Sequence, residues 1–380
     1  MAFVVNNYPP RTGGVELHVR SLAKELARQG HSPLVVTLGT EPGWSSDGGV
    51  RVLTLPEHFR VADILGFPGP GTRRRLTRLL RDERVDVVSV HTRFFPMSFV
   101  GSRAARRARL PLVHTEHGSD HVSSDSAVIR IASRVVDFTL GRAVLRSADR
   151  VLGVSENVVA FVHKLADVDA QVLYNAIDPT PVDTAGQGST PSGDRPNHLV
   201  FVGRLVAGKG WRDFLSAVAE LQREGHNVTA EVLGDGPDRA ALEALVDRLG
   251  LQDSATIRGR VTQDEVRRSV RGATLVNPTT LSEGFQTTLL EALAEHGRVV
   301  TYDVPGARTL QDHGAPVSIA PSRDQHSLVA TLREALESPG DPAPDGFIDE
   351  WTWPARARQF AGVCATLRDS ATTLGVSDEK

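Results

Sequence analysis

The 380-residue sequence contains one cysteine, Cys364, which excludes an intrachain disulfide framework and any cysteine-based metal cluster. A reducing cytoplasm is the simplest location for such a chain. No stretch approaches the roughly 20 apolar residues that a membrane-spanning helix needs. The first residues, Met1 to Val5, lack the basic region and the long apolar run of a signal peptide. We therefore expect a soluble cytoplasmic protein that is at most peripheral on the inner face of a membrane.

Aromatic residues are also few, at 5% of the chain, and they do not interleave with its arginine clusters. Nucleic-acid binding is therefore not expected. Charge is distributed unevenly, because residues 1–180 hold 23 Lys and Arg against 18 Asp and Glu, whereas the remaining residues hold 20 against 28. The arginines gather between Arg73 and Arg81 and between Arg103 and Arg109. These clusters are either solvated helix faces or a surface attracted to anionic lipid or to an anionic acceptor.

The chain is too long for one ordinary core and is expected to form two domains. Its clearest boundary is a segment rich in Pro, Gly, Ser and Thr with almost no apolar residues, so residues 179–197 are interpreted as a linker. This linker separates an N-terminal domain, residues 1–178, from a C-terminal domain, residues 198–350. A final helix within residues 351–370 is expected to pack back toward the N-terminal domain.

Both domains alternate short apolar strands with amphipathic helices. The helix predicted over 15–29 has Leu17, Leu22, Ala23 and Leu26 at core-facing spacing. In the first domain we predict strands near 3–5, 31–37, 50–55, 85–90, 111–115 and 172–178, and helices near 71–82, 97–108, 126–147 and 155–165. In the second we predict strands at 198–202, 228–233, 255–257, 273–277 and 298–302, and helices at 211–223, 238–248, 263–271 and 287–296. This rhythm is typical of parallel βαβ units, so the predicted fold class is α/β with two doubly wound domains.

Two cations follow the first strand of the second domain. Arg204 and Lys209 lie in a glycine-containing loop, Gly203 to Gly210, that precedes the helix at 211. Ligands of open parallel sheets bind beyond the carboxyl ends of the strands, and two cations beside a helix start suit a diphosphate. The spacing approaches that of the phosphate-binding loop of nucleoside triphosphatases. Gly210, however, stands where that loop needs a hydroxyl to hold magnesium, so a diphosphate site is favoured.

Two carboxylates flank a second helix start, in the stretch from Ser282 to Leu293. Glu283 lies in a loop before the helix, and Glu291 lies about one turn into it. A helix N-terminus offers unpaired N–H groups and a partial positive charge to an anion. Because carboxylates would repel a phosphate, we expect Glu283 and Glu291 to bind neutral sugar hydroxyls. Glu291 is expected on a different face from the apolar residues that pack into the core, Leu289, Leu290, Leu293 and Ala294.

No metal site is evident in the sequence. The stretch Asp167-Val168-Asp169 has the spacing of a metal–diphosphate motif, but it lies in a polar turn and is interpreted as surface. We therefore expect neither a metal ion nor another cofactor.

The combination of these motifs resembles the retaining glycosyltransferases of family 4. The residues that carry the resemblance are Glu283 with Glu291 seven residues further on, Gly203-Arg204, Lys209 and Gly13-Gly14, and the likeness runs from Phe3 to the terminal helix. It implies the GT-B fold, in which two doubly wound Rossmann-like domains face each other across a cleft. The first domain would be the acceptor side and the second would bind the nucleotide sugar.

The resemblance also implies a role for each donor-site residue. Arg204 and Lys209 would bind the donor diphosphate. Glu291 would accept hydrogen bonds from the ribose hydroxyls, and Glu283 would hold a hydroxyl of the donor sugar. Backbone N–H groups would come from two glycine-containing loops, formed by Gly13 and Gly14 and by Gly284, Phe285, Gln286 and Thr287.

The remaining correspondences are looser. His117 matches the active-site histidine of the family, with His114 as the competing assignment and a satisfied strand-end histidine as the structural alternative. Loops that shape the nucleotide site are matched more weakly by Gly234, Gly236, Arg260 and Val261. The chain departs from the usual family pattern at Ala176, Gln286, Arg298 and 305–308, which affects the expected sugar preference more than the reaction class.

The implied reaction transfers a hexosyl group from a nucleoside-diphosphate sugar to an acceptor hydroxyl with retained anomeric configuration. Its expected catalytic residues are His117, Glu283, Arg204 and Lys209. The acceptor is expected in cell-envelope glycan, glycolipid or glycoconjugate biosynthesis, with a soluble small molecule as the alternative. A nucleotide-sugar epimerase or isomerase on the same fold is the rival enzyme, and a non-enzymatic sugar-nucleotide sensor is more distant.

Overall fold

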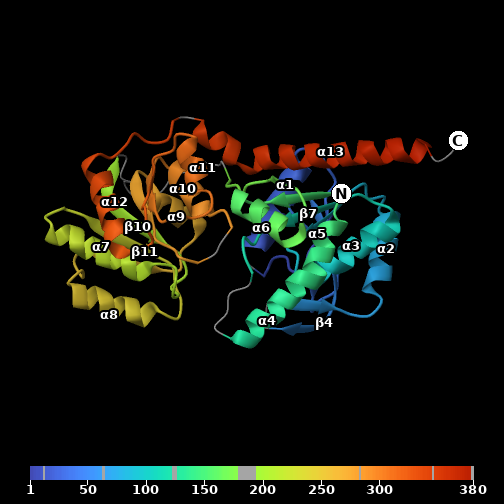
Figure 1. Cartoon of the computed structure of the whole chain (residues 1–380), viewed down its shortest axis with the longest axis horizontal. Helices are drawn as coiled ribbons and strands as arrows, with labels where there is room; N and C mark the ends of the chain where they lie inside the picture. Colours follow the sequence, from blue (N-terminus) through green and yellow to red (C-terminus); the bar gives the residue numbers. More distant parts are fainter. Residues whose placement is uncertain are drawn as a thin grey trace. The chain divides into compact units, whose positions relative to one another are not determined.

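The computed structural model of the chain describes residues 1–11, 13–61, 65–121, 126–178, 194–281, 284–344 and 346–377. The chain divides into two compact units (Figure 1). Unit 1 comprises Met1–Ala176 and Trp353–Lys380, and unit 2 comprises Ile177–Thr352. None of the described helices is both long enough and apolar enough to cross a membrane.

Unit 1 is built on a nine-stranded sheet whose central strands are parallel. The parallel strands lie in the order β4-β2-β1-β6-β7-β8-β9, so the chain winds outward from β1 in one direction and then from β6 in the other. Their bounds are β1 Ala2–Val4, β2 Leu34–Gly39, β4 Val50–Val61, β6 Val88–His91, β7 Leu112–Glu116, β8 Arg150–Gly153 and β9 Ala170–Val172. Strand β8 was not predicted from the sequence, and neither were β3 Gly43–Asp47 and β5 Leu65–Pro68, which pair antiparallel with β4. The point where the winding changes direction lies between β1 and β6.

The helices of unit 1 are α1 Gly14–Arg28, α2 Thr72–Asp82, α3 Pro96–Ala108, α4 Ala127–Val136, α5 Arg142–Ser147, α6 Glu156–Ala166 and α13 Trp353–Ser377. The last of these, α13, packs against α1. Its Phe360 ring stacks on that of Phe3 with centroids 5.6 Å apart. Ala357, Cys364 and Leu367 join the same buried cluster. The C-terminal helix thus supplies part of the core of unit 1.

Unit 2 contains a six-stranded parallel sheet in the order β12-β11-β10-β13-β14-β15. The strands are β10 Arg195–Val202, β11 Thr229–Leu233, β12 Ala255–Gly259, β13 Ala273–Asn277, β14 Arg298–Thr301 and β15 Val317–Ile319. The helices are α7 Trp211–Arg223, α8 Arg239–Leu249, α9 Gln263–Val270, α10 Thr287–Ala294, α11 Ala307–Asp312 and α12 Gln325–Glu337, with a 3₁₀ turn η2 at Phe347–Trp351. This is again a doubly wound sheet, with its change of direction between β10 and β13. The predicted α/β class with two doubly wound domains is confirmed.

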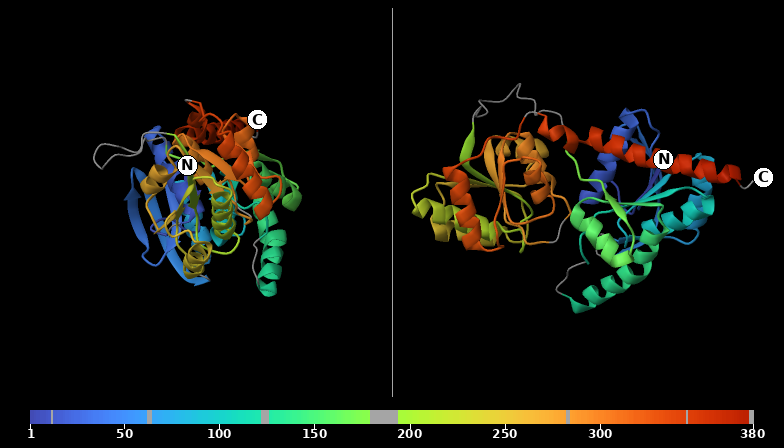
Figure 2. Two further views of the ribbon diagram at one scale, coloured as in Figure 1. Left: turned by 90° about the vertical axis from the view of Figure 1, so that its left-hand side faces the viewer. Right: turned by 45° about the horizontal axis from the view of Figure 1, so that its top comes forward.

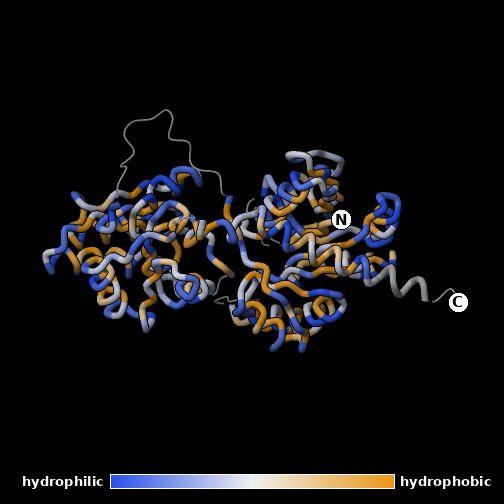
Figure 3. Tube along the Cα trace, turned by 90° about the horizontal axis from the view of Figure 1, so that it is seen from above, coloured by the Kyte–Doolittle hydropathy of each residue, from blue (hydrophilic) through white to orange (hydrophobic). Residues whose placement is uncertain are grey.

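Each unit has buried apolar clusters of its own. In unit 2, Phe201, Trp211 and Phe214 belong to one cluster that also takes in residues of β11, α8 and α12. Hydrophobic stretches run through the interior of each unit, whereas the hydrophilic ones lie mostly at its periphery (Figure 3). The alternation of apolar and polar residues along the helices therefore produces separate cores on both halves of the chain.

The predicted strand over 172–178 is wrong. The parallel ladder ends at Val172, and the chain then turns so that Asn175 Oδ1 lies 3.0 Å from Nδ1 of His18. Leu173, Ala176 and Ile177 are nevertheless buried. Their apolar character reflects packing against the core and not pairing in a sheet, and these two causes give the same sequence pattern.

The helix predicted over 126–147 is interrupted. A π-helical turn, η1 at Asp137–Gly141, separates α4 from α5. Figure 2 shows α4 projecting beyond the rest of unit 1. Leu17 is a second correction, because its side chain is 46% exposed although its spacing in α1 predicted burial.

Candidate functional site

In unit 2 the loops that follow the parallel strands are joined at the carboxyl edge of the sheet. The Leu205 N–H donates to the Asp235 carbonyl at 3.0 Å, which links the loop after β10 to the loop after β11. Gly234 has a φ of 142°, and a side chain there would collide with the carbonyl of Gly203. Gly236 likewise lies against the Leu205 carbonyl. Only glycine allows these two backbones to approach so closely.

The loop after β10 is also bound to the loop after β13. The carbonyl of Gly208 accepts a hydrogen bond from the Thr280 N–H at 2.8 Å and another from the Thr279 hydroxyl at 3.1 Å. Gly210 has a φ of 84°, and a Cβ there would collide with the Pro278 carbonyl. Because β10 and β13 flank the change of direction in the sheet, these loops form the edge where doubly wound folds bind ligands.

The two predicted cations lie in this joined set of loops. Arg204 is exposed, and no hydrogen bond or ion pair of its guanidinium occurs among the residues that the structure describes. Lys209 is half-buried, five residues further along the loop and just before α7. A guanidinium and an ammonium in one loop at this edge provide the charge needed to bind a diphosphate.

The N-terminus of α10 lies at the same edge, and no side chain of the described residues caps it. Gln286 is the N-cap residue, but its Oε1 accepts a hydrogen bond from Asn277 Nδ2 at 2.7 Å instead of capping the helix. Phe285 is buried and stacks on Trp351 with ring centroids 5.4 Å apart. Gly284 and Thr287 are half-buried. This segment therefore has backbone N–H groups to offer to an anion, whereas the Phe285 side chain belongs to the core.

Glu291 is more buried than expected. It is only 6% exposed, and its Oε1 accepts a hydrogen bond from Nε2 of Gln263 in α9 at 2.9 Å. Burial raises the pKa of Glu291, and the Gln263 hydrogen bond and the charge of Arg267 oppose that rise. The expectation that Glu291 lies apart from the buried face is wrong, because α9 packs over it. Ser282 and its neighbour Glu283 lie outside the described residues.

The weaker candidates lie in the loops next to this carboxylate. Arg260 is exposed and Val261 is half-buried, and both precede Gln263 at the start of α9. The Gly234 N–H donates to the Gly259 carbonyl at 2.8 Å, so the loop after β12 is linked to the loop after β11. Four loops of unit 2 thus hold nearly all the predicted donor-site residues that the structure describes in this unit.

In unit 1, Gly13 and Gly14 lie at the start of α1, and Gly13 is its N-cap residue. Among residues 1–11 and 13–61 and the other described ranges, no side chain caps this helix by a hydrogen bond. The carboxylate of Glu16, however, packs against Gly13 where a Cβ would stand. A carboxylate in the first turn lowers the positive potential of the helix start. The anion-binding role predicted for this loop must therefore compete with Glu16.

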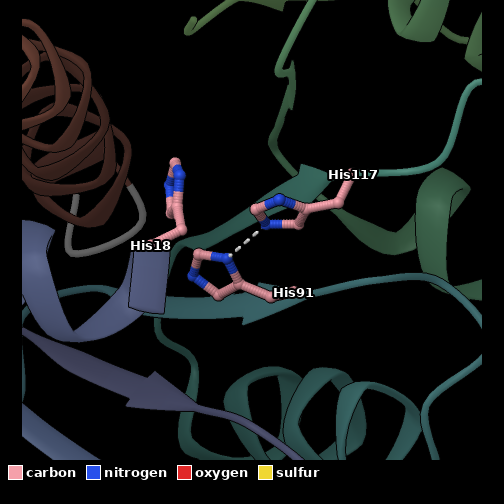
Figure 4. Close-up of side chains that lie close together, drawn as sticks. All are labelled: His18, His91 and His117. Carbon is pink, nitrogen blue, oxygen red and sulfur yellow. Dashed lines mark hydrogen bonds between the residues drawn. The ribbon is translucent and has the colours of Figure 1, made fainter. Parts of the chain in front are cut away.

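His117 belongs to a cluster of three histidines at the carboxyl edge of the unit 1 sheet (Figure 4). Its Nε2 lies 3.1 Å from Nδ1 of His91, the last residue of β6. The ring of His18, from α1, meets that of His117 edge-on with centroids 4.8 Å apart. Burial first, and the neighbouring imidazoles second, hold the pKa values of His91 and His117 well below their ordinary value. All three rings are therefore neutral at neutral pH, since burial also lowers the pKa of His18 to about 4.

The three imidazoles could ligate a transition metal by their chemistry. One ring nitrogen from each lies within 4.8 Å of the others, and Nε2 of His18 is buried with no hydrogen-bond partner in the described part of the chain. A tetrahedral zinc ion with Zn–N bonds of about 2.05 Å needs its ligand nitrogens about 3.4 Å apart. The rings would have to move together to meet this spacing. No metal site was expected from the sequence, and this group was not anticipated.

A buried ion-pair network holds the loop that carries His117. Arg93 is 1% exposed and pairs with Glu116 Oε1 at 3.0 Å and with Asp137 Oδ1 at 2.8 Å. The Glu116 carboxylate in turn accepts hydrogen bonds from the N–H groups of His117 (3.1 Å) and Gly118 (3.0 Å). Burial opposes ionisation of Glu116, but the charge of Arg93 and the hydrogen bonds from His114 and the Gly118 N–H together outweigh it and hold the pKa of Glu116 below its ordinary value. The backbone around His117 is thereby fixed.

The competing histidine has a different environment. His114 is completely buried within β7, with its Nε2 3.1 Å from Glu116 Oε2. His117 instead follows the end of that strand and is half-buried. Four residues around it were not predicted from the sequence: His18, His91, Arg93 and Glu116. His91, Arg93 and Glu116 lie at or just after the ends of strands, and this position was the signal that could have marked them as candidate site residues. Their partners, however, are distant in the sequence.

Comparison with known proteins assigns both halves of the chain. Residues 12–180 match the family model described as Glycosyltransferase Family 4, and residues 186–348 match that of Glycosyl transferases group 1. The 2-deoxystreptamine glucosyltransferase of Streptomyces kanamyceticus is 27% identical over 87% of this chain and 90% of its own length. One component of the phosphatidylinositol N-acetylglucosaminyltransferase of Arabidopsis thaliana is 28% identical over 86% of this chain and 72% of its own length.

Solved structures show the same architecture. A glycosyltransferase from Rickettsia africae superimposes with a TM-score of 0.73 at 14% identity, covering 96% of this chain and 98% of that one. The Anabaena protein HepE in complex with UDP superimposes with a TM-score of 0.67 at 18% identity, covering 99% of both chains. The two family models together span nearly all of the chain, and both domains have the expected fold. The chain belongs to the family 4 glycosyltransferases, which have the GT-B fold.

Proposed function

We propose that this protein transfers a hexosyl group from a nucleoside-diphosphate sugar to an acceptor hydroxyl with retention of anomeric configuration and without a metal ion. The observation that carries the proposal is the carboxyl edge of the unit 2 sheet. Arg204, Lys209 and the N-terminus of α10, which no side chain of the described residues caps, lie there in loops joined by backbone hydrogen bonds. Two cations and a helix start are what the leaving group of such a donor, a diphosphate, requires.

A uridine nucleotide is the first donor class to test. The Anabaena HepE chain, which has the same fold, has been solved with UDP and with UDP-glucose. In this chain Glu291 would accept hydrogen bonds from the ribose hydroxyls, with Gln263 fixing one of its two oxygens. Glu283 would hold a hydroxyl of the transferred sugar, as the family resemblance implies.

In the proposed reaction the bond between the anomeric carbon and the diphosphate oxygen breaks, and its electron pair leaves with the diphosphate. Arg204, Lys209 and the α10 N–H groups stabilise that negative charge as it develops, which is usually the largest contribution to the rate. The acceptor oxygen bonds to the anomeric carbon from the same face, and its proton passes to the departing phosphate oxygen. His117, neutral because of its burial, would contribute a hydrogen bond to the donor sugar and not a positive charge.

For the acceptor we propose a hydroxyl of a cell-envelope glycan, glycolipid or glycoconjugate, with a soluble small molecule as the alternative. The relatives include enzymes named for both kinds, one for 2-deoxystreptamine and one for phosphatidylinositol. The arginines of α2 and α3 are largely exposed and give unit 1 a basic surface that suits an anionic acceptor. We propose a cytoplasmic location, peripheral to the inner face of the membrane.

Transfer with retention is tested by incubating the protein with UDP-glucose and with a panel of other nucleotide hexoses and glycan, lipid and aminocyclitol acceptors. We expect release of UDP or another nucleoside diphosphate in amounts equal to the glycoside formed. Proton NMR of the product should show the same anomeric configuration as the donor. Inverted product would contradict the mechanism, and an altered sugar still attached to its nucleotide would indicate an epimerase or isomerase instead.

Chelation tests the metal-free reaction. We expect the initial rate to be unchanged by excess EDTA, because the charge on the leaving group is met by Arg204 and Lys209. Loss of activity with EDTA and its recovery with manganese would refute this. Recovery with zinc alone, lost again in a His18→Ala variant, would instead assign the metal to the three-histidine cluster.

A further inference from the structure

Helix α4 of unit 1 exposes an apolar surface along its whole length. None of its residues is buried. Val128 is 76% exposed, Ile131 64% and Val135 57%, and two residues of the following turn, Phe138 and Leu140, are also exposed. The helix projects beyond the rest of unit 1 (Figure 2). Large apolar side chains exposed together on one element usually mark a contact surface.

Four of the apolar residues of α4 share one face, and Ile129 and Val136 widen it on one side. At 100° per residue, Val128, Ile131, Ala132 and Val135 lie within about 100° of one another. Arg130 and Arg134 lie on the other side of the helix and are exposed. The segment from 126 to 136 contains no Asp or Glu. The helix therefore combines an apolar face with a polar face whose charges are all positive, the pattern of helices that lie in a membrane interface.

The C-terminal end of α4 is fixed by buried ion pairs, which prevents the helix from rotating its apolar face toward the core. Asp137, directly after α4, is 1% exposed and binds Arg93 Nε at 2.8 Å and His121 Nδ1 at 2.6 Å. Arg93 also binds Glu116, whose carboxylate accepts the His117 N–H. The same buried network thus fixes both the start of η1 and the loop of the candidate active-site histidine.

We propose that α4 and η1 form the surface by which this protein docks on an anionic lipid bilayer. The apolar face enters the boundary between headgroups and acyl chains, and Arg130 and Arg134 meet lipid phosphates. A second copy of the chain is a poorer occupant, because pairing α4 with α4 would bring arginines together with no carboxylate between residues 126 and 136 to neutralise them. The proposal deepens the proposed function and rests on it for the acceptor. A protein docked in this way would act on a lipid-linked acceptor at the bilayer surface.

The test is flotation of the full-length protein with vesicles of phosphatidylcholine alone or mixed with phosphatidylglycerol, without donor or acceptor. We expect binding to the anionic vesicles only, weakened by high salt. Ile131→Ser with Val135→Ser should weaken it at least about tenfold. Arg130→Gln and Arg134→Gln should each weaken it by about fivefold. All these side chains are exposed, so the melting temperature should not change.

Two matched controls decide the outcome. Arg74→Gln with Arg78→Gln removes an exposed arginine pair of the same spacing from α2, and Leu17→Ser removes an exposed apolar side chain from α1. Both should bind vesicles as the unchanged protein does. Equal loss in the α2 variant would overturn the proposal in favour of a diffuse basic surface. Absence of vesicle binding, with a dimer in sedimentation that Ile131→Ser and Val135→Ser dissociate, would overturn it in favour of self-association.

The docking surface and the proposed reaction fail in distinguishable ways. Thermal stabilisation by UDP should be the same in the Ile131→Ser, Val135→Ser variant as in the unchanged protein, because α4 carries none of the donor-site residues. Vesicle binding without stabilisation by any nucleoside diphosphate would leave the docking surface standing and count against the donor site. Stabilisation by UDP without vesicle binding would support the donor site and overturn the docking surface.

Discussion

Replacing Arg204 by alanine is expected to lower kcat by about 10²- to 10³-fold, since one preorganised charge on a developing anion typically contributes that much. Arg204 is exposed at the carboxyl edge of the unit 2 sheet, and its guanidinium has no hydrogen-bond or ion-pair partner among the described residues. Its removal therefore breaks no such contact within the described part of the chain. The effect should appear in kcat much more than in KM, because the charge matters most as the diphosphate departs.

Two variants separate this role from a general charge effect. Arg204→Lys keeps the positive charge but loses two-point binding of phosphate oxygens, so its rate should fall between those of alanine and arginine. Arg223→Ala removes an exposed arginine from the far end of α7 and should leave kcat unchanged. Steady-state release of UDP measures all three. A kcat for Arg204→Ala within about a factor of three of the unchanged protein would refute the assignment.

Glu291→Gln is expected to weaken UDP binding by about 10- to 100-fold while raising the thermal stability of the protein. Hydrogen bonds to a charged acceptor contribute about 1.5–3 kcal/mol, and the substitution removes the charge that would receive the ribose hydroxyls. The substituted amide keeps an oxygen to accept from Gln263. The folded protein then no longer has to hold a buried charge, so the free energy of unfolding rises at neutral pH.

The dependence on pH distinguishes this explanation from a packing effect. Burial raises the pKa of Glu291 in the folded protein. The stability that this carboxyl contributes is thus fully present below the unfolded pKa of about 4.3 and is lost as pH rises through the folded pKa. The melting temperature of Glu291→Gln should accordingly exceed that of the unchanged protein above this window and approach it below. UDP affinity should fall as the pH drops through the same window.

Calorimetric titration with UDP and melting curves over a pH series measure these effects. Glu243→Gln, at an exposed position on α8, is the control and should alter neither quantity beyond about 0.5 kcal/mol. A variant of Glu291 that binds UDP as tightly as the unchanged protein would rule out the ribose role. A melting-temperature difference that does not vary with pH would instead indicate a change in packing.

Much of the fold could be predicted because its local signals agree with one another. Helix α7 was predicted with its observed bounds, since Gly210 precedes it, apolar residues recur at helical spacing, and Gly225 follows it. Strand β13 was also predicted with its observed bounds, from a short apolar run that ends before Pro278. Where local pattern and burial diverge, the prediction failed, as at Leu173 to Ile177, where apolar residues are buried without joining a sheet.

The candidate site was predictable only in part. Arg204 and Lys209 were recognisable because a cation after a strand carries a local signal, and the fold places them in one loop. The interactions around His117 were not recognisable, because His91 and His18 contact it, and Arg93 binds the neighbouring Glu116, through the folding of the chain and not through sequence spacing. Burial of Glu291 was equally hidden, since Gln263 of α9, which covers it, lies 28 residues earlier in the chain.

The position of α13 has a consequence for how the chain is made. Ala357, Phe360, Cys364 and Leu367 of α13 complete a buried cluster of unit 1 whose other fully buried residues all precede residue 177. During synthesis, therefore, the first 176 residues leave the ribosome without the helix that covers α1. All of unit 2, residues 177–352, is synthesised before α13 completes unit 1, so unit 2 can fold first, which reverses the usual N-terminal-first order. The apolar surface of α1 stays uncovered until α13 has been synthesised. Unit 1 is therefore the part of the nascent protein that is most prone to misfold and to bind chaperones.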